Sequence, residues 1–197
     1  MTPLSKLVTV KEGFSQEDVM KLMYKNRIEK VLVIGEDDAL TGLVTMKDIE
    51  KSAQHPDATK DTSGRLQVGA ALGTGVDTLD RAQALYDSGV DVYVIDSAHA
   101  HSKNVIDTIK KIKSTFKDID VIGGNIATSE AALELVKAGA DAVKVGMGPG
   151  SICTTRIIAG IGVPQISAIL DIKSALKKTD INIIADGGIR FSGDIAK

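Results

Sequence analysis

The segment VIGGNIATSEAALELVKAGADAVKVGMGPG, residues 121–150, decides which fold we expect. It opens with an apolar run at Val121–Gly123, passes through a helical pattern over Ser129–Ala138 and returns to a second apolar run at Ala142–Val145. Two short runs of this kind joined by a helix are typical of parallel strands, because a parallel pair needs a crossover connection. The segment therefore predicts a strand–helix–strand unit that leads into a glycine-rich loop.

The same alternation continues on both sides of this segment, from Arg65 towards the last residues. Six apolar strands with crossovers of suitable length predict a parallel α/β sheet. The further strands are expected at Val68–Leu72, Val92–Ile95, Val163–Ser167 and Ile181–Ala185, and the further helices at Leu79–Asp87, Asn104–Phe116 and Leu170–Lys178.

A closed barrel and an open, doubly wound sheet both fit this alternation. Polar or glycine-rich residues follow several different strands, namely Asp96-Ser97, Asn125, Gly146–Gly150 and Asp186-Gly187-Gly188. Sites spread over many strand ends favour a (β/α)8 TIM barrel, whereas an open sheet concentrates them at one switch point. We therefore expect an incomplete barrel with about six of the eight strands and with exposed parallel edges.

A smaller α/β unit precedes this region. Residues 1–52 form the expected first domain, residues 53–65 a polar linker with Pro56 and Gly64, and residues 66–197 the incomplete barrel. Ser15 is a plausible N-cap, and Glu36-Asp37-Asp38 predicts a turn between two strands. The elements expected in the first domain are strands at Leu7–Val10, Val31–Ile34 and Leu40–Val44, a helix at Ser15–Asn26 and a short helix from Thr45.

Composition argues against several classes of partner and location. The formal net charge is −2 and the pI is near 5.9, so the chain lacks the basic surface that binds nucleic acids or acidic membranes. The sequence from Met1 to Val10 has no long apolar run of the kind found in a signal peptide. We expect a cytoplasmic protein with no nucleic-acid or membrane partner.

The single cysteine, Cys153, lies in the segment KVGMGPGSICTTR, residues 144–156. A lone cysteine is often an inert buried thiol, but here three glycines and several hydroxyl side chains surround it in a loop after a strand. Glycines let the backbone approach a phosphate, a cation or a planar base closely. This setting favours a nucleophilic Cys153. Downstream, Asp186-Gly187-Gly188 could bind sugar hydroxyls and phosphate, although alone it reads as a simple turn.

These residues carry a resemblance to inosine monophosphate dehydrogenases of the bacterial type. It rests on Gly148–Arg156 (GPGSICTTR), on Gly123–Ile126 (GGNI) upstream and on Ala185–Gly188 (ADGG) downstream. The glycine-rich cysteine loop is specific to this family and to the related GMP reductases. Residues 7–51 resemble the second half of the paired cystathionine-β-synthase (CBS) modules inserted in that family's barrel, so the first domain is expected to be the C-terminal part of a CBS module.

The resemblance implies NAD-dependent oxidation of IMP to xanthosine monophosphate, in guanine nucleotide biosynthesis, through a covalent intermediate on Cys153. It implies further that Thr155 orients the hydrolytic water, and that a monovalent cation, normally K+, is bound. The remaining residues that it implies are Ser151, Asn125, Asp186, Gly187 and Gly188 for the nucleotide, Asp96, Ser97, Gly146, Met147 and Gly148 for NAD, and the carbonyls of Gly148, Gly150 and Cys153 for K+. A homotetramer is expected for the full-length family.

His99 and His101 close to Asp96 invite a metal site, but the segment also matches the family's NAD-side loop. In that loop Ala100 stands where the family has glycine. The general-base arginine–tyrosine pair of the family and its later phosphate loop fall beyond Lys197. The chain as given is therefore expected to lack steady turnover.

Two alternatives stay open at this point. GMP reductase shares the cysteine loop, but it normally lacks the inserted module, so residues 7–51 argue against it. A non-catalytic nucleotide-binding fragment is the second alternative.

Overall fold

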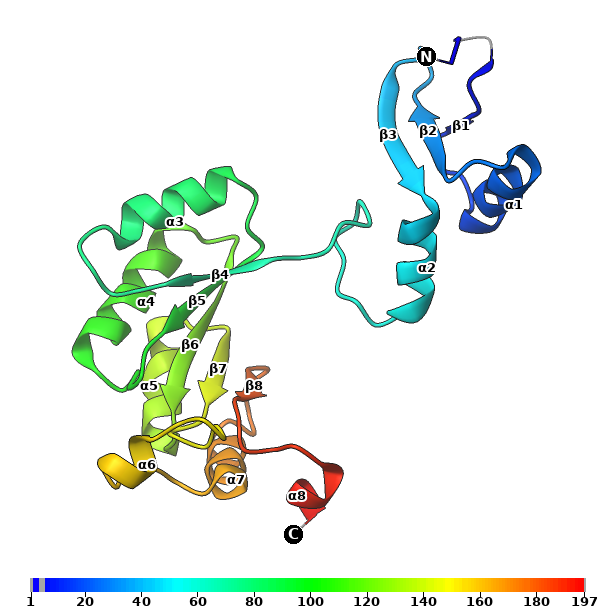
Figure 1. Cartoon of the computed structure of the whole chain (residues 1–197). Helices are drawn as coiled ribbons and strands as arrows, with labels where there is room; N and C mark the ends of the chain where they lie inside the picture. Colours follow the sequence, from blue (N-terminus) through cyan, green and yellow to red (C-terminus); the bar gives the residue numbers. More distant parts are fainter. Residues whose placement is uncertain (1, 4–5, 197) are drawn as a thin grey trace. The chain divides into compact units, whose positions relative to one another are not determined.

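The chain divides into two compact units, Met1–Leu66 and Gln67–Lys197. The computed structural model describes residues 2–3 and 6–196 (Figure 1). Helix α2 (Met46–Gln54) extends into the residues expected to form a linker, so the first residues of the range 53–65 are helical.

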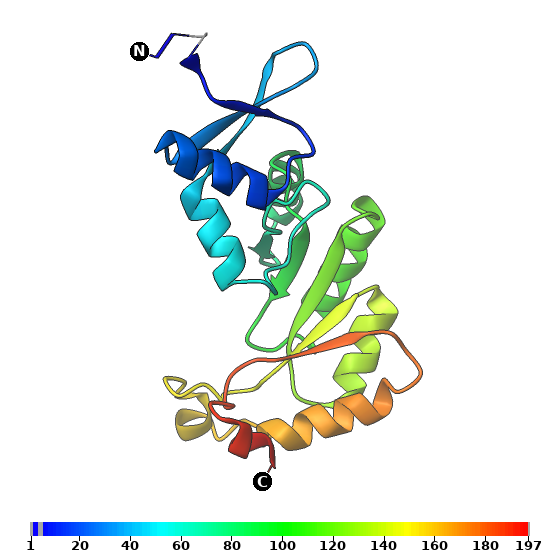
Figure 2. The same cartoon turned by 90° about the vertical axis from the view of Figure 1, so that its right-hand side faces the viewer.

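The first unit holds a three-stranded sheet in the order β1-β2-β3. Strand β1 (Thr9–Lys11) pairs in parallel with β2 (Lys30–Ile34), and β2 pairs antiparallel with β3 (Leu40–Thr45). Helices α1 (Gln16–Asn26) and α2 lie against this sheet (Figure 2). Val19, Met23, Val31 and Ile49 are the buried residues of this small core.

Side-chain caps fix where the two helices of the first unit begin. The predicted cap at Ser15 is confirmed, because its hydroxyl accepts a hydrogen bond from the Asp18 N–H at 3.1 Å. At α2, Thr45 accepts from the Asp48 N–H, and the Asp48 carboxylate accepts from the Thr45 N–H at 2.9 Å. This reciprocal capping box satisfies two backbone donors that a helix start leaves free.

The second unit contains a five-stranded, fully parallel sheet in the order β4-β5-β6-β7-β8. Each pair of successive strands is joined by a connection that contains at least one helix, and chain order and sheet order are the same. The strands are β4 (Gly69–Leu72), β5 (Val92–Asp96), β6 (Asp120–Ile126), β7 (Ala142–Val145) and β8 (Asn182–Ala185), and the helices are α3 (Thr78–Asp87), α4 (Lys103–Thr115), α5 (Ser129–Ala138), α6 (Thr155–Ile158), α7 (Gln165–Ala175) and α8 (Ser192–Ala196).

The sixth expected strand is absent from the described sheet. Val163–Ser167 was predicted as a strand, and this prediction is wrong, because Pro164 caps helix α7 and the helix begins at Gln165. Gln165, Ala168 and Ile172 are the buried residues of α7, at helical spacings of three and four. The expected helix at Leu170–Lys178 therefore begins five residues earlier, and the sheet has five strands instead of six.

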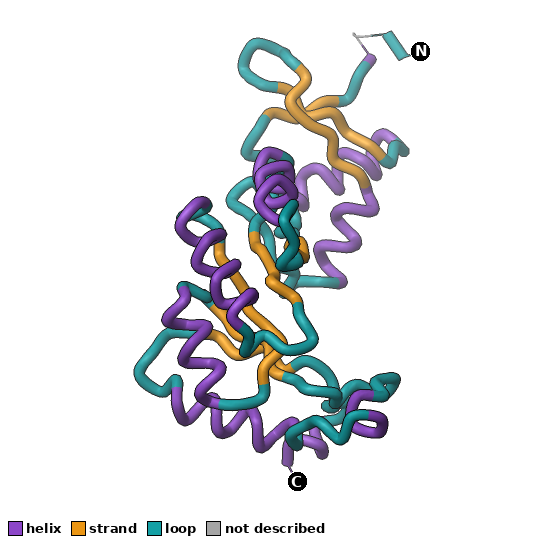
Figure 3. The backbone as a smooth tube through the Cα atoms, turned by 90° about the vertical axis from the view of Figure 1, so that its left-hand side faces the viewer, coloured by secondary structure: helices purple, strands orange, loops and turns teal. Residues whose placement is uncertain are grey.

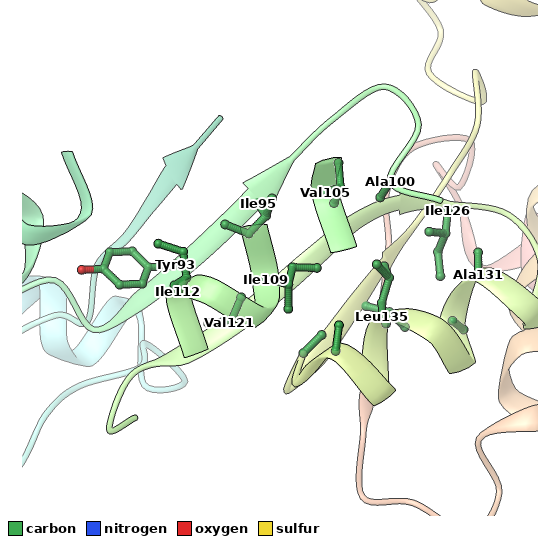
Figure 4. Close-up of a cluster of buried hydrophobic side chains, with 14 of the residues drawn as sticks. Tyr93, Ile95, Ala100, Val105, Ile109, Ile112, Val121, Ile126, Ala131 and Leu135 are labelled. Carbon is green, nitrogen blue, oxygen red and sulfur yellow. The ribbon is translucent and has the colours of Figure 1, made fainter. Parts of the chain in front are cut away.

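The hydrophobic core of the second unit lies between the sheet and the helices on one of its faces (Figure 3). Tyr93 and Ile95 of β5 and Val121 of β6 point into this layer, where Ile109 of α4 and Leu135 of α5 are fully buried (Figure 4). Alternate strand residues point to the other face, where Val94 and Ile122 are only partly buried. Within the described residues, no helix is long and apolar enough to span a membrane.

Candidate active site

The carboxyl ends of β5, β6, β7 and β8 surround one cavity. Because parallel strands end at the same edge of a sheet, the residues that follow them come together. Figure 1 shows the arrowheads of β6 and β7 directed towards the segment that holds α6. The cavity has a volume of about 400 Å³ and is lined by Asp96, Ser97, Ala98, Asn125, Lys144, Gly146, Met147, Gly148, Cys153, Thr155 and Asp186.

The thiol of Cys153 lies in this cavity beside a hydroxyl group. Its Sγ is 3.2 Å from Oγ1 of Thr155, and its backbone N–H donates to the Gly150 carbonyl at 3.0 Å. Hydrogen bonds from the side chain and the backbone of Thr155 hold the pKa of Cys153 below its ordinary value, and the Arg156 charge adds to the effect. A larger fraction of the group is therefore thiolate at neutral pH, and thiolate is the nucleophilic form.

Arg156 ties the two ends of the cysteine loop together. Its guanidinium donates to the carbonyl of Met147 at 3.1 Å, before the loop, and to the carbonyl of Val163 at 2.5 Å, after it. Gly148 faces the Arg156 side chain and has a positive φ of 69°, which a glycine adopts without strain. The loop that carries Cys153 is thus closed by side-chain hydrogen bonds as well as by its glycines.

A group of charged and amide side chains forms part of the cavity wall. Nζ of Lys144 on β7 lies 3.0 Å from Oδ1 of Asp96 and 2.8 Å from Oδ2 of Asp186. Nδ2 of Asn125 donates to the same Oδ2 of Asp186 at 2.8 Å. The hydrogen bonds from Lys144 and then Asn125 hold the pKa of Asp186 below its ordinary value. Burial acts to lower the pKa of Lys144, but its bonds to Asp186 and Asp96 outweigh it and raise that pKa.

Gln165 makes hydrogen bonds to the backbone at the ends of β7 and β8. Its Nε2 donates to the carbonyl of Val145 at 2.7 Å and to that of Asp186 at 3.3 Å. The side chain joins the ends of β7 and β8 from the first turn of α7. Its own Oε1 is buried, and within the described residues it has no hydrogen-bond partner.

Not every residue expected at the site lines the cavity. Asp96, Ser97, Asn125, Gly146, Met147, Gly148, Cys153, Thr155 and Asp186 do so, whereas Ser151, Gly150, Gly187 and Gly188 do not. Gly187 and Gly188 lie against the backbone of Pro149 and Gly150, where a Cβ on Gly187 would come within 3.2 Å of the Gly150 nitrogen. The Asp-Gly-Gly turn thus packs directly beneath the cysteine loop.

The histidines after β5 do not form a metal-binding cluster. The ring centroids of His99 and His101 are 6.3 Å apart, and Nε2 of His101 lies 3.3 Å from Oε2 of Glu134 on α5. Across residues 2–3 and 6–196, no three His, Cys, Asp or Glu side chains gather closely enough to hold a metal ion.

Sequence reasoning missed Lys144, Arg156 and Gln165 as parts of the site. Lys144 left a signal, because a lysine inside the apolar run AVKV must find a charged partner if the strand is covered. Arg156 and Gln165 gave no such signal in the sequence, because their contacts depend on how the loop after β7 folds back on the strand ends.

Comparison with known proteins shows which family this chain resembles. The model of the "IMP dehydrogenase / GMP reductase domain" matches residues 12–197. The chain belongs to the IMP dehydrogenase / GMP reductase family. It is 55% identical over 191 residues to the inosine-5′-monophosphate dehydrogenase of Aquifex aeolicus (strain VF5), a match that covers 97% of this chain and 39% of that protein. It is 52% identical over 197 residues to the enzyme of Escherichia coli (strain K12), which covers 100% of this chain and 40% of that protein.

Solved structures of family members agree with these matches. A cysteine-to-alanine variant of a GMP reductase from Trypanosoma brucei, in complex with guanosine 5′-monophosphate, superimposes with a TM-score of 0.82 at 44% identity, covering 100% of this chain and 42% of that one. The same enzyme in complex with guanosine 5′-triphosphate gives a TM-score of 0.82 at 45% identity and covers 47% of that chain. The chain thus spans about 40% of the length of the curated relatives that it matches.

Proposed function

We propose that this chain carries the catalytic cysteine site of an IMP dehydrogenase, which oxidises IMP to xanthosine monophosphate with NAD. The supporting observation is the convergence of Cys153, Thr155, Asn125 and Asp186 on one cavity, in a chain 52–55% identical to proteins of that name. The cavity volume of about 400 Å³ lies within the roughly 300–1,000 Å³ of small-molecule sites.

Cys153 provides the nucleophile in this proposal. Its thiolate adds to C2 of the purine and forms a C–S bond, and the hydrogen on C2 then departs with its electron pair. Bound NAD supplies the acceptor for this hydride. The resulting thioimidate is hydrolysed when water adds to C2: one proton of the water goes to N3, the other is released to solvent, and the C–S bond breaks to return the thiolate. Thr155, whose hydroxyl is 3.2 Å from Sγ, is placed to orient that water.

Other residues bind and orient the two nucleotides. The Asp186 carboxylate accepts hydrogen bonds from ribose hydroxyls, with Asn125 beside it. Ser151 and the amides of Gly187 and Gly188 hold the phosphate of IMP, at the face of the loop outside the cavity. Asp96, Ser97 and Gly146–Gly148 line the side assigned to NAD.

The residues present fit a bound monovalent cation. Within the described part of the chain, no backbone hydrogen bond is made to the carbonyl oxygens of Gly148 and Cys153, while the Gly150 carbonyl accepts one from Cys153. Carbonyl oxygens suit hard cations such as K+. We propose that Gly148, Gly150 and Cys153 supply part of the K+ coordination and that the ion fixes the loop.

The architecture supports a part of a larger (β/α)8 barrel. Five parallel strands follow one another in chain order, helices cover one face, and Val94 and Ile122 on the other face are apolar and only partly buried. A barrel would enclose that second face. We propose in addition that residues 1–52 are the C-terminal part of a CBS module, and that the whole protein assembles as a homotetramer.

The test is formation of a covalent adduct on Cys153. The purified chain is incubated with IMP, NAD and K+, NADH is followed by absorbance, and the intact mass is measured. We expect a mass increase corresponding to the nucleotide, together with about one equivalent of NADH. Cys153→Ser should abolish both signals. A parent chain that shows neither signal contradicts the proposal and favours a nucleotide-binding fragment without this chemistry.

GMP reductase activity is the second candidate function, because the solved structures similar to this chain include GMP reductases. The first unit was expected to argue against it, but a GMP reductase structure covers 100% of this chain, so that unit does not separate the two activities. The same incubation with GMP and NADPH discriminates them. Oxidation of NADPH that depends on Cys153, without NADH formation from IMP, would assign the reductase.

A further inference from the structure

Lys144 of β7 reaches Asp96 across β6, where the intervening residue, Gly124, has no side chain. Asp96 of β5 pairs with Gly124 of β6, and Gly124 pairs with Lys144 of β7, so the three residues form one row across the sheet. A Cβ on Gly124 would approach the Lys144 carbonyl oxygen to 2.9 Å and would meet the start of its side chain. Neighbouring strands are about 4.8 Å apart, so the glycine lets Lys144 extend over β6 to Asp96.

Each of the two carboxylates is bound through only one of its own two oxygen atoms in the described residues. Lys144 and Asn125 both bind Oδ2 of Asp186, and Lys144 approaches Oδ1 of Asp96. Within the described residues, Oδ1 of Asp186 and Oδ2 of Asp96 take part in no hydrogen bond or ion pair, although both residues line the cavity. Each carboxylate thus keeps one acceptor oxygen for a hydroxyl or amide donor of a ligand.

The charges of Lys144, Asp96 and Asp186 also determine which part of a nucleotide these residues can bind. Two carboxylates and one ammonium leave a formal charge of −1, and the Lys144 side chain is only 18% exposed. A phosphate placed here would be repelled, whereas neutral hydroxyl groups would find charged acceptors, which make stronger hydrogen bonds than neutral ones.

We propose that Lys144 is a positioning residue that holds Asp96 and Asp186 together, with one oxygen of Asp186 turned to the ribose hydroxyls of the substrate nucleotide. The inference rests on the proposed function for its ligand, and its geometric part stands on the row Asp96–Gly124–Lys144. Within the described residues, the side-chain bonds of Lys144 go to Asp96 and Asp186 and not to Cys153, so it acts through the two carboxylates.

The first measurement needs no nucleotide. The pKa of the Asp186 carboxyl is determined by ¹³C NMR in the parent chain, in Lys144→Met, which keeps the length of the side chain but not its charge, and in Lys144→Arg. We expect the pKa of Asp186 to rise in Lys144→Met and to stay low in Lys144→Arg. Lys110→Met, which removes a surface lysine 3.9 Å from Asp107, is the matched control and should leave it unchanged.

The second measurement is calorimetric titration with IMP and with 2′,3′-dideoxy-IMP. If Lys144 orients Asp186 towards the ribose, Lys144→Met binds IMP about tenfold more weakly and loses about tenfold of its preference over the dideoxy compound. Lys144→Arg should restore most of both. A loss of general structure would instead weaken both ligands equally.

The outcomes separate this inference from the proposed function. An unchanged Asp186 pKa in Lys144→Met overturns the inference, whatever the nucleotides do. A parent chain that binds IMP, with Lys144→Met keeping both its affinity and its discrimination, also overturns the inference and leaves the proposed function intact. A parent chain that binds neither nucleotide overturns the proposed function and with it the role of Lys144 towards the ribose.

Discussion

At the residue scale, the hydroxyl of Thr155 is the largest cause of the lowered pKa of Cys153. Removing that hydroxyl in Thr155→Val should raise the pKa of Cys153 towards its ordinary value, because the thiolate loses its main hydrogen-bond donor. A raised pKa leaves less thiolate at a given pH, so the pH profile of alkylation by iodoacetamide should move to higher pH and the rate at pH 7 should fall.

The neighbouring residue provides the control for this prediction. Thr154→Val makes the same chemical change one position earlier, where no side-chain hydrogen bond to Sγ is present in the described residues. Its alkylation profile should match that of the parent chain. Equal shifts in both variants would show that the hydroxyl bond to Cys153 does not set its pKa.

Gln165 allows a second prediction at this scale. Gln165→Leu removes one of the two donors to the Val145 carbonyl and leaves the partly buried Asp186 carbonyl without its donor, which costs about 1–3 kcal/mol. Hydrogen exchange of the amide of Asp186, which donates to Val145 at 2.8 Å, should be faster. Gln83→Leu, at an exposed glutamine whose side chain donates to Asp87, should leave that exchange rate unchanged.

Part of the cavity lining could be predicted from the sequence, but Lys144 and the bonds among the lining residues could not. Asp96, Asn125, Cys153 and Asp186 were expected at strand ends because parallel strands bring those ends to one edge, and they do line one cavity. Which oxygen of Asp186 Lys144 binds depends on strand register and on the missing side chain of Gly124. Neither can be read from local patterns.

At the element scale, the capping box of α2 gives a pH-dependent prediction. The hydrogen bonds from the Thr45 side chain and backbone hold the pKa of Asp48 below its ordinary value. Asp48 therefore adds stability above its unfolded pKa of about 3.9, and that contribution is lost as pH falls through the lower folded value. Asp48→Asn should weaken α2 at pH 7, with a gap to the parent that narrows as the pH falls below about 4.

Hydrogen exchange of the His55 amide, which donates to Lys51 in the last turn of α2, measures this effect. Glu50→Gln removes a negative charge from an exposed position in the same helix and serves as the control. If Glu50→Gln shows the same pH dependence as Asp48→Asn, general charge instead of the cap is responsible.

Elements with one clear period were predicted well, and the ambiguous run was not. Ser129–Ala138 and Ala142–Val145 have the predicted bounds. Val163–Ser167 failed because a short apolar run fits a buried strand and a buried helix equally. The proline at position 164 was the usable signal, since it lacks an N–H for a central strand but suits the start of a helix.

At the scale of the whole molecule, each unit has a hydrophobic core of its own. The smaller one contains Met23 and Val31, and the larger one contains Ile109 and Leu135. The linker expected at residues 53–65 came from a polar stretch without hydrophobic period. The division between the compact units falls between Leu66 and Gln67, so those residues belong to the first unit. Closure of a (β/α)8 barrel requires eight strands, and the sheet described in the larger unit has five.

Two core substitutions should act on different units. Leu135→Ala leaves a cavity under the five-stranded sheet and should cost about 2–5 kcal/mol, which hydrogen exchange at the Asp141 amide, bonded to Val121 at 2.8 Å, will register. Met23→Ala should do the same in the first unit, at the Ile28 amide bonded to Met23. Leu133→Ala and Tyr24→Ala, at positions 48% and 69% exposed on the same two helices, are the matched controls.

Because each core is built from residues of its own unit, Leu135→Ala should leave the exchange protection of the Ile28 amide unchanged. Equal loss of protection at the Asp141 and Ile28 amides would mean that the two cores unfold as one cooperative structure.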